Sequence, residues 1–266
     1  MVTAPTRRRR RTRATRPTTA RLAITSGLAP RLTDALLVAE HVRKALLRKS
    51  DGASIFSGHD DARKPQRGHP HTFILPEANS DDGRMTHVTL YASAGFSQGD
   101  RAAIENLPRL FLKGGELTVV LLDIGHCSAF AGFDARAGEC PLLATSRVWI
   151  SHTPFVATRH PKAYRDGRPK LDDTGLQIGC PEHDLRRLMK ANGIPEPSVV
   201  ESVKETVLAG RPVRWTRFRT RRSDGNGARS NGAGSGFRLE FAEPWSGPLV
   251  LGYGAHFGLG VFKATR

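Results

Sequence analysis

Two histidines, His69 and His71, lie where a polar loop meets an expected strand. Loop–strand junctions often carry catalytic side chains, and the two-residue spacing points both imidazoles to the same side of the chain if the strand begins that early. Because the pKa of histidine lies near neutrality, one imidazole can accept a proton and another can donate one. We therefore take His71 and His69 as candidate general base and acid. The competing interpretation is that His71 caps a sheet edge through a hydrogen bond.

A third candidate, His41, lies on an expected helix, with Lys44 and Arg48 three and seven residues further on. This spacing places the three side chains on one basic stripe of the helix. His41 is the reserve catalytic candidate, although such a stripe taken alone is more typical of a solvated helix face.

Four glycines interrupt an apolar, strand-like run near the end of the chain: Gly252, Gly254, Gly258 and Gly260. Glycine weakens a strand unless another backbone or a ligand must approach closely. Together with His256 and Lys263 they predict a backbone surface that holds phosphates. The alternatives are a sharply bent terminal strand without a ligand and, for His256, a histidine packed at a tight bend.

The charge of the chain favours a polyanion as partner. It holds 41 Lys and Arg against 25 Asp and Glu, a formal net charge of +16 over 266 residues, and such a surplus is typical of nucleic-acid binding. No run approaches the roughly 20 apolar residues of a membrane span, so we expect no membrane partner. Three widely spaced cysteines without a Cys-x-x-Cys pair argue against a structural zinc site and favour the cytoplasm.

Further candidate RNA contacts are basic residues of two segments: Arg159, His160, Arg217, Arg219, Arg221 and Arg222. In the second segment the arginines interleave with Trp215 and Phe218, which predicts a surface that tracks an RNA backbone and stacks bases. The competing interpretation is an edge strand whose arginines deter aggregation.

The elements that must position these residues predict an α+β protein with two ferredoxin-like units in tandem and a glycine-rich strand or loop at the C-terminus. Residues 20–122 have the order β-α-β-β-α-β of that unit, and the second half repeats it more loosely. The expected division is a disordered basic arm over 1–19, a first domain over 20–125 and a second over 145–266.

Three local patterns carry the element assignment. A helix from about residue 33 to 49 should bury a stripe through Ala35, Ala39 and Leu46. Ser97 and Asp100 have the spacing of a capping box, and the helix they begin should run to about residue 112, shortened or bent by Pro108. Residues 249–262 read as a final strand.

Sequence segments in a fixed order resemble a known family. They are 39–43 with 50–52, 68–77, 82–91 with 95–96, 158–160 and 252–262. Together they are similar to the rear half of the type I-G (formerly I-U) CRISPR-associated fusion protein, whose rear module belongs to the repeat-associated RNA-binding (RAMP) superfamily. The matching region starts close to Met1, so we expect the front module of that family to be encoded separately or lost.

The resemblance implies a function. The protein would bind CRISPR repeat RNA and cleave precursor crRNA by acid–base chemistry without a metal or other cofactor, giving a 2′,3′-cyclic phosphate. Other subunits of a CRISPR effector complex are further expected partners.

Two alternatives remain open from the residues. A non-catalytic crRNA-binding subunit would use the same basic surface. A metal-dependent nuclease would draw its ligands from His59-Asp60-Asp61 with His69 and His71. That motif falls in a loop, whereas a His–Asp metal dyad usually lies on a helix.

Overall fold

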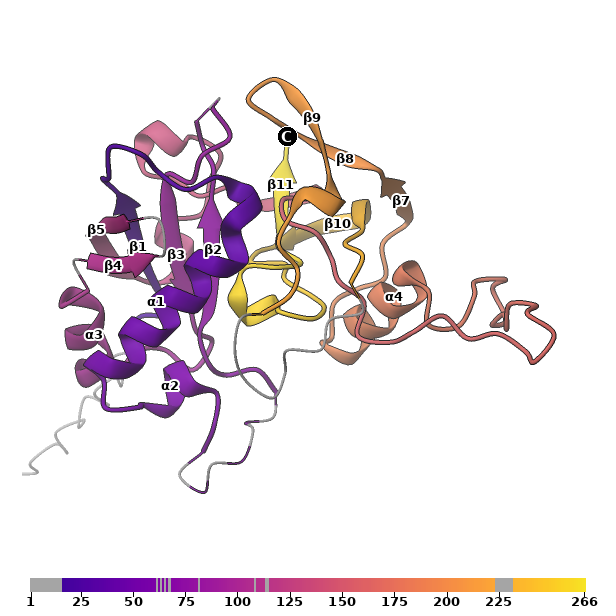
Figure 1. Cartoon of the computed structure of the whole chain (residues 1–266), viewed down its shortest axis with the longest axis horizontal. Coiled ribbons are helices and arrows are strands. Elements are labelled where there is room, and N and C mark those ends of the chain that lie inside the picture. Colours follow the sequence, from indigo (N-terminus) through magenta and orange to yellow (C-terminus); the bar gives the residue numbers. More distant parts are fainter. Residues whose placement is uncertain are drawn as a thin grey trace, which may run out of the picture.

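The structure is a computed structural model that describes residues 16–60, 62, 64, 66, 68–80, 82–107, 109–112, 115–222 and 232–266. Residues 1–15 of the expected disordered arm and the polar segment 223–231 lie outside the described residues. The end of the arm is ordered, contrary to expectation, because Thr19 belongs to β1 (Thr19–Ile24) and the amide of Thr18 donates to the carbonyl of Gly125. Figure 1 shows two α+β units side by side, the first in indigo to magenta and the second in pink to yellow.

The described residues of the first unit form nine elements. They are β1 (Thr19–Ile24), η1 (Leu32–Asp34), α1 (Ala35–Lys49), α2 (Ser54–Ser57), β2 (Phe73–Glu77), β3 (His87–Tyr91), α3 (Gln98–Glu105), β4 (Arg109–Leu112) and β5 (Gly115–Gly125). The antiparallel sheet has the order β2-β3-β1-β5-β4. If the edge strand β4 is left out, one helix follows the first strand of the sheet and another follows the third. This is the arrangement of the expected ferredoxin-like unit.

The local patterns of this unit form as the sequence predicts. Ala35, Ala39 and Leu46 of α1 are buried, each at most 1% exposed, so the helix packs its apolar stripe into the core. Ser97 Oγ accepts from the amide of Asp100 at 3.2 Å, and Asp100 Oδ2 accepts from the amide of Ser97 at 2.8 Å. These two bonds confirm the capping box of α3.

The expected continuation of α3 to about residue 112 is wrong. The helix ends at Glu105, and β4 pairs with β5 from Arg109 to Leu112. Pro108 explains the break, because a proline inside a helix lacks the amide hydrogen and its ring collides with the preceding turn.

Among the described residues, the second unit repeats the strand order of the ferredoxin-like motif but forms only the first of its two helices, α4 (Pro181–Ala191). Its elements are η2 (Cys127–Ala129), η3 (Ala135–Ala137), β6 (Thr145–Ser151), α4 (Pro181–Ala191), β7 (Val199–Val203), β8 (Glu205–Leu208), β9 (Arg211–Arg214), η4 (Trp215–Arg217), β10 (Gly236–Ser246), η5 (Ala255–Phe257) and β11 (Phe262–Thr265). The sheet order β11-β6-β10-β7 is again that of a ferredoxin-like unit. Between its third and fourth strands, however, the described chain forms the three-residue turn η5 in place of a helix. The fold is thus a tandem of two ferredoxin-like units, as the sequence predicts.

The expected strand over residues 249–262 is wrong for most of its length. Only Phe262–Thr265 pair along β6, as β11. The four glycines before it have φ values between +60° and +96°, and this left-handed backbone cannot continue a strand. Of the two forms expected for this segment, a glycine-rich strand or a glycine-rich loop, the structure has the loop.

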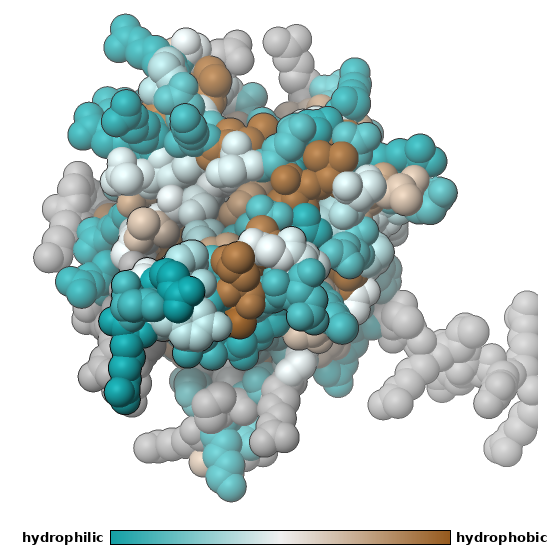
Figure 2. Space-filling model, turned by 90° about the vertical axis from the view of Figure 1, so that its right-hand side faces the viewer, coloured by the Kyte–Doolittle hydropathy of each residue, from teal (hydrophilic) through white to brown (hydrophobic). Residues whose placement is uncertain are grey.

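The two units are packed together through β2. His152, just after β6, donates through Nε2 to the carbonyl of Pro76 at 3.1 Å. A small apolar cluster that includes Leu75, Leu142 and Val261 fills the space between the units. No described helix is long and apolar enough to cross a membrane, and the face shown in Figure 2 is largely hydrophilic with separate apolar patches.

A histidine cluster as candidate active site

Two neighbouring histidines and a third that is far from them in the sequence meet at the junction of the units. His69 and His71 precede β2, and His256 lies in η5 of the second unit. The ring centroids of His71 and His256 are 3.6 Å apart, and those of His69 and His256 are 5.1 Å apart. The structure thus brings both primary catalytic candidates to the glycine-rich segment.

Aromatic stacking fixes the ring of His256. The ring of His71 stacks on that of His256 with centroids 3.6 Å apart and an interplanar angle of 19°. The ring of Phe73 also stacks on it, with centroids 3.9 Å apart and an angle of 23°. These near-parallel contacts hold the imidazole in one plane. Its two nitrogens are therefore directed along fixed lines.

The hydrogen bonds of His256 determine the tautomers of two rings. Nδ1 of His256 lies 3.1 Å from the carbonyl oxygen of Thr72, and Nε2 lies 2.9 Å from Nδ1 of His69. A carbonyl only accepts, so Nδ1 of His256 carries the proton and, in the neutral ring, Nε2 accepts. His69 must then donate through Nδ1, which leaves Nε2 of its neutral ring with a lone pair.

The burial of the rings separates their roles. Burial, and next the charges of His69, Arg43 and His59, lowers the pKa of His71 to about 4. Burial and His71 likewise hold the pKa of His256 well below its usual value. Both rings are therefore neutral at pH 7, whereas His69 is exposed. Among the three, His69 is the ring that can meet a substrate and exchange a proton.

The backbone at His69 is unusual. Its φ is +50°, a left-handed value that non-glycine residues seldom adopt. Such a conformation costs roughly 1–3 kcal/mol and persists where the surroundings hold it in place. The hydrogen bond to His256 is one such restraint, since it ties the side chain to the second unit.

Contacts with Gly58, and with the segment before it that Arg43 holds, also position the ring of His71. Gly58, with φ +71°, packs against its ring, and a Cβ at that position would come 2.9 Å from the ring atoms Cδ2 and Nε2. Arg43 of α1 donates to the carbonyls of Phe56 and Ser57, which hold the segment just before Gly58. Nδ1 of His71 is buried without a hydrogen-bond partner among the described residues.

The glycines serve the geometry of the loop. Gly254 and Gly258, with φ of +72° and +75°, flank η5 and turn the chain at both of its ends. A Cβ at Gly252 would come 2.7 Å from the carbonyl oxygen of Val156, and one at Gly260 would overlap that of Leu251. Gly258 and Gly260 are buried, so a direct contact with phosphate rests on Gly252 and Gly254.

His41 is not brought to the cluster. Its Nδ1 lies 2.8 Å from the carbonyl oxygen of Leu37, one turn back on α1. The face of α1 that approaches η5 carries Arg43, whose guanidinium lies 4.9 Å from the ring centre of Phe257. The reserve catalytic role of His41 therefore has no geometric support.

The expected basic surface is only partly exposed. Arg159, His160, Arg217, Arg219 and Arg221 are exposed. Arg222 is largely covered: it pairs with Glu40 at 3.4 Å and lies 4.1 Å from the ring centre of Phe257.

The expected base stacking on Trp215 and Phe218 is wrong. The two rings are 4% and 5% exposed and belong to the core of the first unit. Lys263 is half-buried, and this burial lowers its pKa.

Sequence reasoning missed Thr72, Phe73 and Arg43 as parts of the site. Thr72 acts through its carbonyl, which no side-chain pattern reveals. Phe73 follows the histidine pair at the same two-residue spacing, and that alternation is the signal that could have placed it beside His71.

Metal ligation finds no support among the described residues, where no group of three or more His, Cys, Asp or Glu side chains converges. Asp61, a member of the alternative metal motif, lies outside them. In the cluster itself, the stacked rings of His71 and His256 direct their nitrogens along parallel planes, so their lone pairs do not meet at one point.

Comparison with known proteins gives similarity of fold only. No protein-family model and no curated protein matches the sequence. Among solved structures, the chain is similar to a CRISPR-associated protein Cas6 (TM-score 0.46, 10% identity, 93% of this chain and 98% of that one). It is also similar to a RAMP protein binding different RNA substrates (0.43, 17%, 93% and 98%) and to a Cas6-related protein from Pyrococcus furiosus (0.42, 12%, 94% and 99%).

Proposed function

We propose that the protein binds RNA and cleaves it at the histidine cluster without a metal ion. The observation that carries the proposal is the chain from the Thr72 carbonyl through His256 to His69. It leaves an accessible imidazole with a fixed tautomer, which is what a general base requires. The charge of +16 supplies the attraction for the polyanion.

The chemistry is an internal transesterification. Nε2 of His69 takes the proton of a ribose 2′-hydroxyl, and the 2′-oxygen attacks the adjacent phosphorus. The bond from phosphorus to the 5′-oxygen breaks, and the imidazolium of His69 returns the proton to that oxygen. The products are a 2′,3′-cyclic phosphate and a 5′-hydroxyl, so atoms and charges balance without an added water.

The substrate class follows from the sequence resemblance. Segments 68–77 and 252–262, which meet in the cluster, belong to the motifs that resemble the type I-G CRISPR-associated protein. Repeat RNA of a CRISPR array, in precursor crRNA, is therefore the substrate that we propose. Association with other subunits of an effector complex is part of the same proposal.

The test is cleavage of the cognate repeat RNA by the full chain in excess EDTA, with end-group analysis of the products. We expect a 2′,3′-cyclic phosphate and a 5′-hydroxyl. His69→Ala should lower the single-turnover rate by about 10²–10⁴-fold and leave RNA affinity within a few fold. The matched control is His41→Ala, which should leave the rate unchanged because His41 lies outside the cluster.

Three outcomes would contradict the proposal. Loss of cleavage in EDTA with recovery in Mg²⁺ or Mn²⁺ would favour a metal-dependent nuclease. Tight binding of repeat RNA without any cleavage would favour a non-catalytic crRNA-binding subunit. A rate unchanged in His69→Ala would place the catalytic base elsewhere.

A further inference from the structure

A groove lies between the hairpin β8–β9 and the turn that joins β2 to β3. It has a volume of about 920 Å³ and a mostly polar lining. Its charged residues are five arginines and one aspartate: Arg31, Arg84, Arg211, Arg214, Arg217 and Asp82. They come from three separate parts of the chain, so the sequence alone does not show that they meet.

The charge of this groove is largely uncompensated. Asp82 is occupied by its own turn, where it accepts from Ser80 Oγ and from the amide of Arg84, whose Nε lies 3.9 Å away. Arg31 and the three arginines of the hairpin segment are exposed. Within the described part of the chain, none of these four forms an ion pair.

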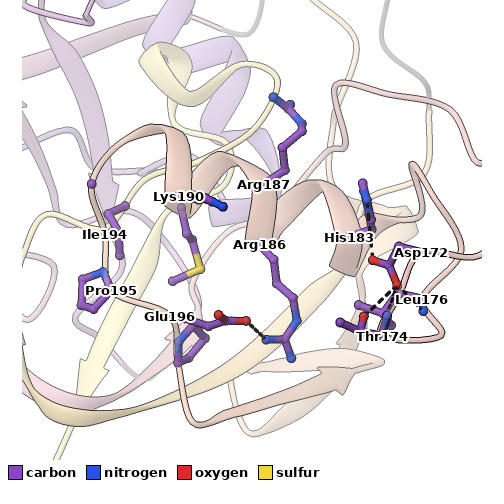
Figure 3. A pocket seen from close by; sticks show the side chains of 13 residues that line it. Asp172, Thr174, Leu176, His183, Arg186, Arg187, Lys190, Ile194, Pro195 and Glu196 are labelled. Atoms are coloured by element: carbon purple, nitrogen blue, oxygen red, sulfur yellow. Dashed lines mark hydrogen bonds and ion pairs between the residues drawn. The ribbon is translucent and has the colours of Figure 1, made fainter.

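The cavity at α4 provides the contrast. It has a volume of about 740 Å³, and Figure 3 shows its basic side chains beside acidic ones. Arg186 pairs with Glu182 and Glu196, each at 2.9 Å, and Arg187 pairs with Asp184 at 2.7 Å. A phosphate there would compete with these carboxylates, whereas in the arginine groove Arg84 alone has a carboxylate partner among the described residues.

The walls of the arginine groove are held together by packing. A Cβ at Gly83, in the turn, would come 2.9 Å from Cβ of Leu208 in β8. The carbonyl of Gly83 also accepts from the amide of Leu32 at 3.1 Å, next to Arg31. The arginines therefore stand on segments that contact each other directly.

The groove is connected to the histidine cluster along α1. The amide of Arg219 donates to the carbonyl of Thr33, just before that helix, at 3.0 Å. Arg222 then reaches Glu40, one residue before His41 on α1, and the ring of Phe257 in η5. The groove lies at the turn that follows β2, whereas His71 lies just before β2, so at least the length of that strand separates the groove from the cluster.

We propose that the arginine groove anchors phosphates of the RNA strand at the opposite end of β2 from the bond that the histidine cluster cleaves. The inference rests on the proposed function and adds to it a surface that holds the substrate backbone outside the histidine cluster. Guanidinium groups suit this role because their planar donors match phosphate oxygens in pairs. The contacts are to the backbone, so the groove contributes affinity that does not depend on base sequence.

The test measures binding of a fluorescein-labelled 2′-O-methyl oligouridylate of 20 nucleotides, which lacks the 2′-hydroxyl and so resists cleavage. The variant is the triple substitution Arg31→Gln, Arg211→Gln and Arg214→Gln in the full chain. We expect an affinity loss of about tenfold or more. The slope of log affinity against log salt should become shallower by about 2, since each contact to a single strand contributes about 0.7.

The matched control removes three exposed arginines that do not line the groove: Arg101, Arg147 and Arg165. It should change affinity by less than about twofold, and circular dichroism with a thermal melt should show both variants folded. Equal losses in both triple variants, or an unchanged slope in the groove variant, would overturn the anchor.

The two proposals fail separately. If the groove variant binds oligouridylate like the wild type while the wild type still cleaves repeat RNA in EDTA, the anchor is wrong and the cleavage proposal stands. If the groove variant loses affinity as expected but the wild type never cleaves, the surface is an RNA anchor of a non-catalytic protein, and its role in holding a cleaved substrate is overturned.

Discussion

The two ferredoxin-like units differ at the same topological position, after their third strand. The first unit forms α3 there, a helix begun by a capping box that packs on its own sheet. The second unit forms η5, three residues between two left-handed glycines, and this turn contacts β2 of the first unit. Because this segment forms no helix that packs on its own sheet, it places His256 against the first unit. The candidate site therefore belongs to neither unit alone.

The difference also separates two uses of glycine. Gly52, in the loop after α1, has φ +83°, and no atom lies within 4 Å of the position that a Cβ would take, so only its backbone conformation favours glycine. Gly260 has φ +60° and in addition lies against the carbonyl of Leu251. Its amide also donates to the carbonyl of Pro154 at 2.9 Å. In the second unit, glycine is required both by conformation and by space.

The largest expected effect breaks this comparison at Gly260. Gly260→Ala should lower the free energy of unfolding by more than about 3 kcal/mol, because the methyl group overlaps a buried carbonyl at a left-handed position. Gly52→Ala, the matched control, should cost only about 1 kcal/mol, which is the cost of the conformation alone. Urea denaturation followed by circular dichroism measures both values. Equal losses in the two variants would refute the distinction.

A smaller effect concerns the contact of His152 with β2. Burial, and next the charge of Lys263, lowers the pKa of His152 to about 3. The unfolded state therefore binds more protons below pH 6.5, and stability must fall as the pH falls. Between pH 6.5 and pH 4 the loss should reach about 3 kcal/mol, with His71 adding in the same direction.

His152→Gln separates the two histidines. Glutamine can still donate to the carbonyl of Pro76 but does not titrate, so the variant should show a flatter decline of unfolding free energy between pH 6.5 and pH 4. Denaturation at several pH values, with the wild type in parallel, measures the slopes. A variant slope as steep as that of the wild type would contradict a neutral, buried His152.

The fold could be predicted where local rules decide it. The buried stripe of α1 and the capping box of α3 depend on residues within a few positions of each other, and both are confirmed. Sequence reasoning misses β4 because Arg109–Leu112 follows the helix so closely that Pro108 resembles a bend within one element. It predicts a strand over residues 249–262 because apolar alternation hides the left-handed glycines.

The site shows the same boundary between local and distant information. His69 and His71 lie just before β2, as expected, but neither belongs to the strand and His69 has a φ of +50°, so the alternation expected from their spacing does not apply. Their meeting with His256 depends on packing between units, which spacing cannot express. Trp215 and Phe218 are misassigned because an alternation of basic and aromatic residues also describes a segment that buries one face in the core.

The most direct test of the proposed site is the tautomeric state of the two linked histidines. Nitrogen-15 multiple-bond NMR of the full chain at pH 7.5 reports which ring nitrogen carries the proton. We predict the Nδ1–H tautomer for both His256 and His69. In His256→Phe, which keeps the stacking but removes the hydrogen bond, His69 should no longer be held in the Nδ1–H tautomer. The Nε2–H tautomer at His69 in the wild type would remove the accessible lone pair and contradict the central claim.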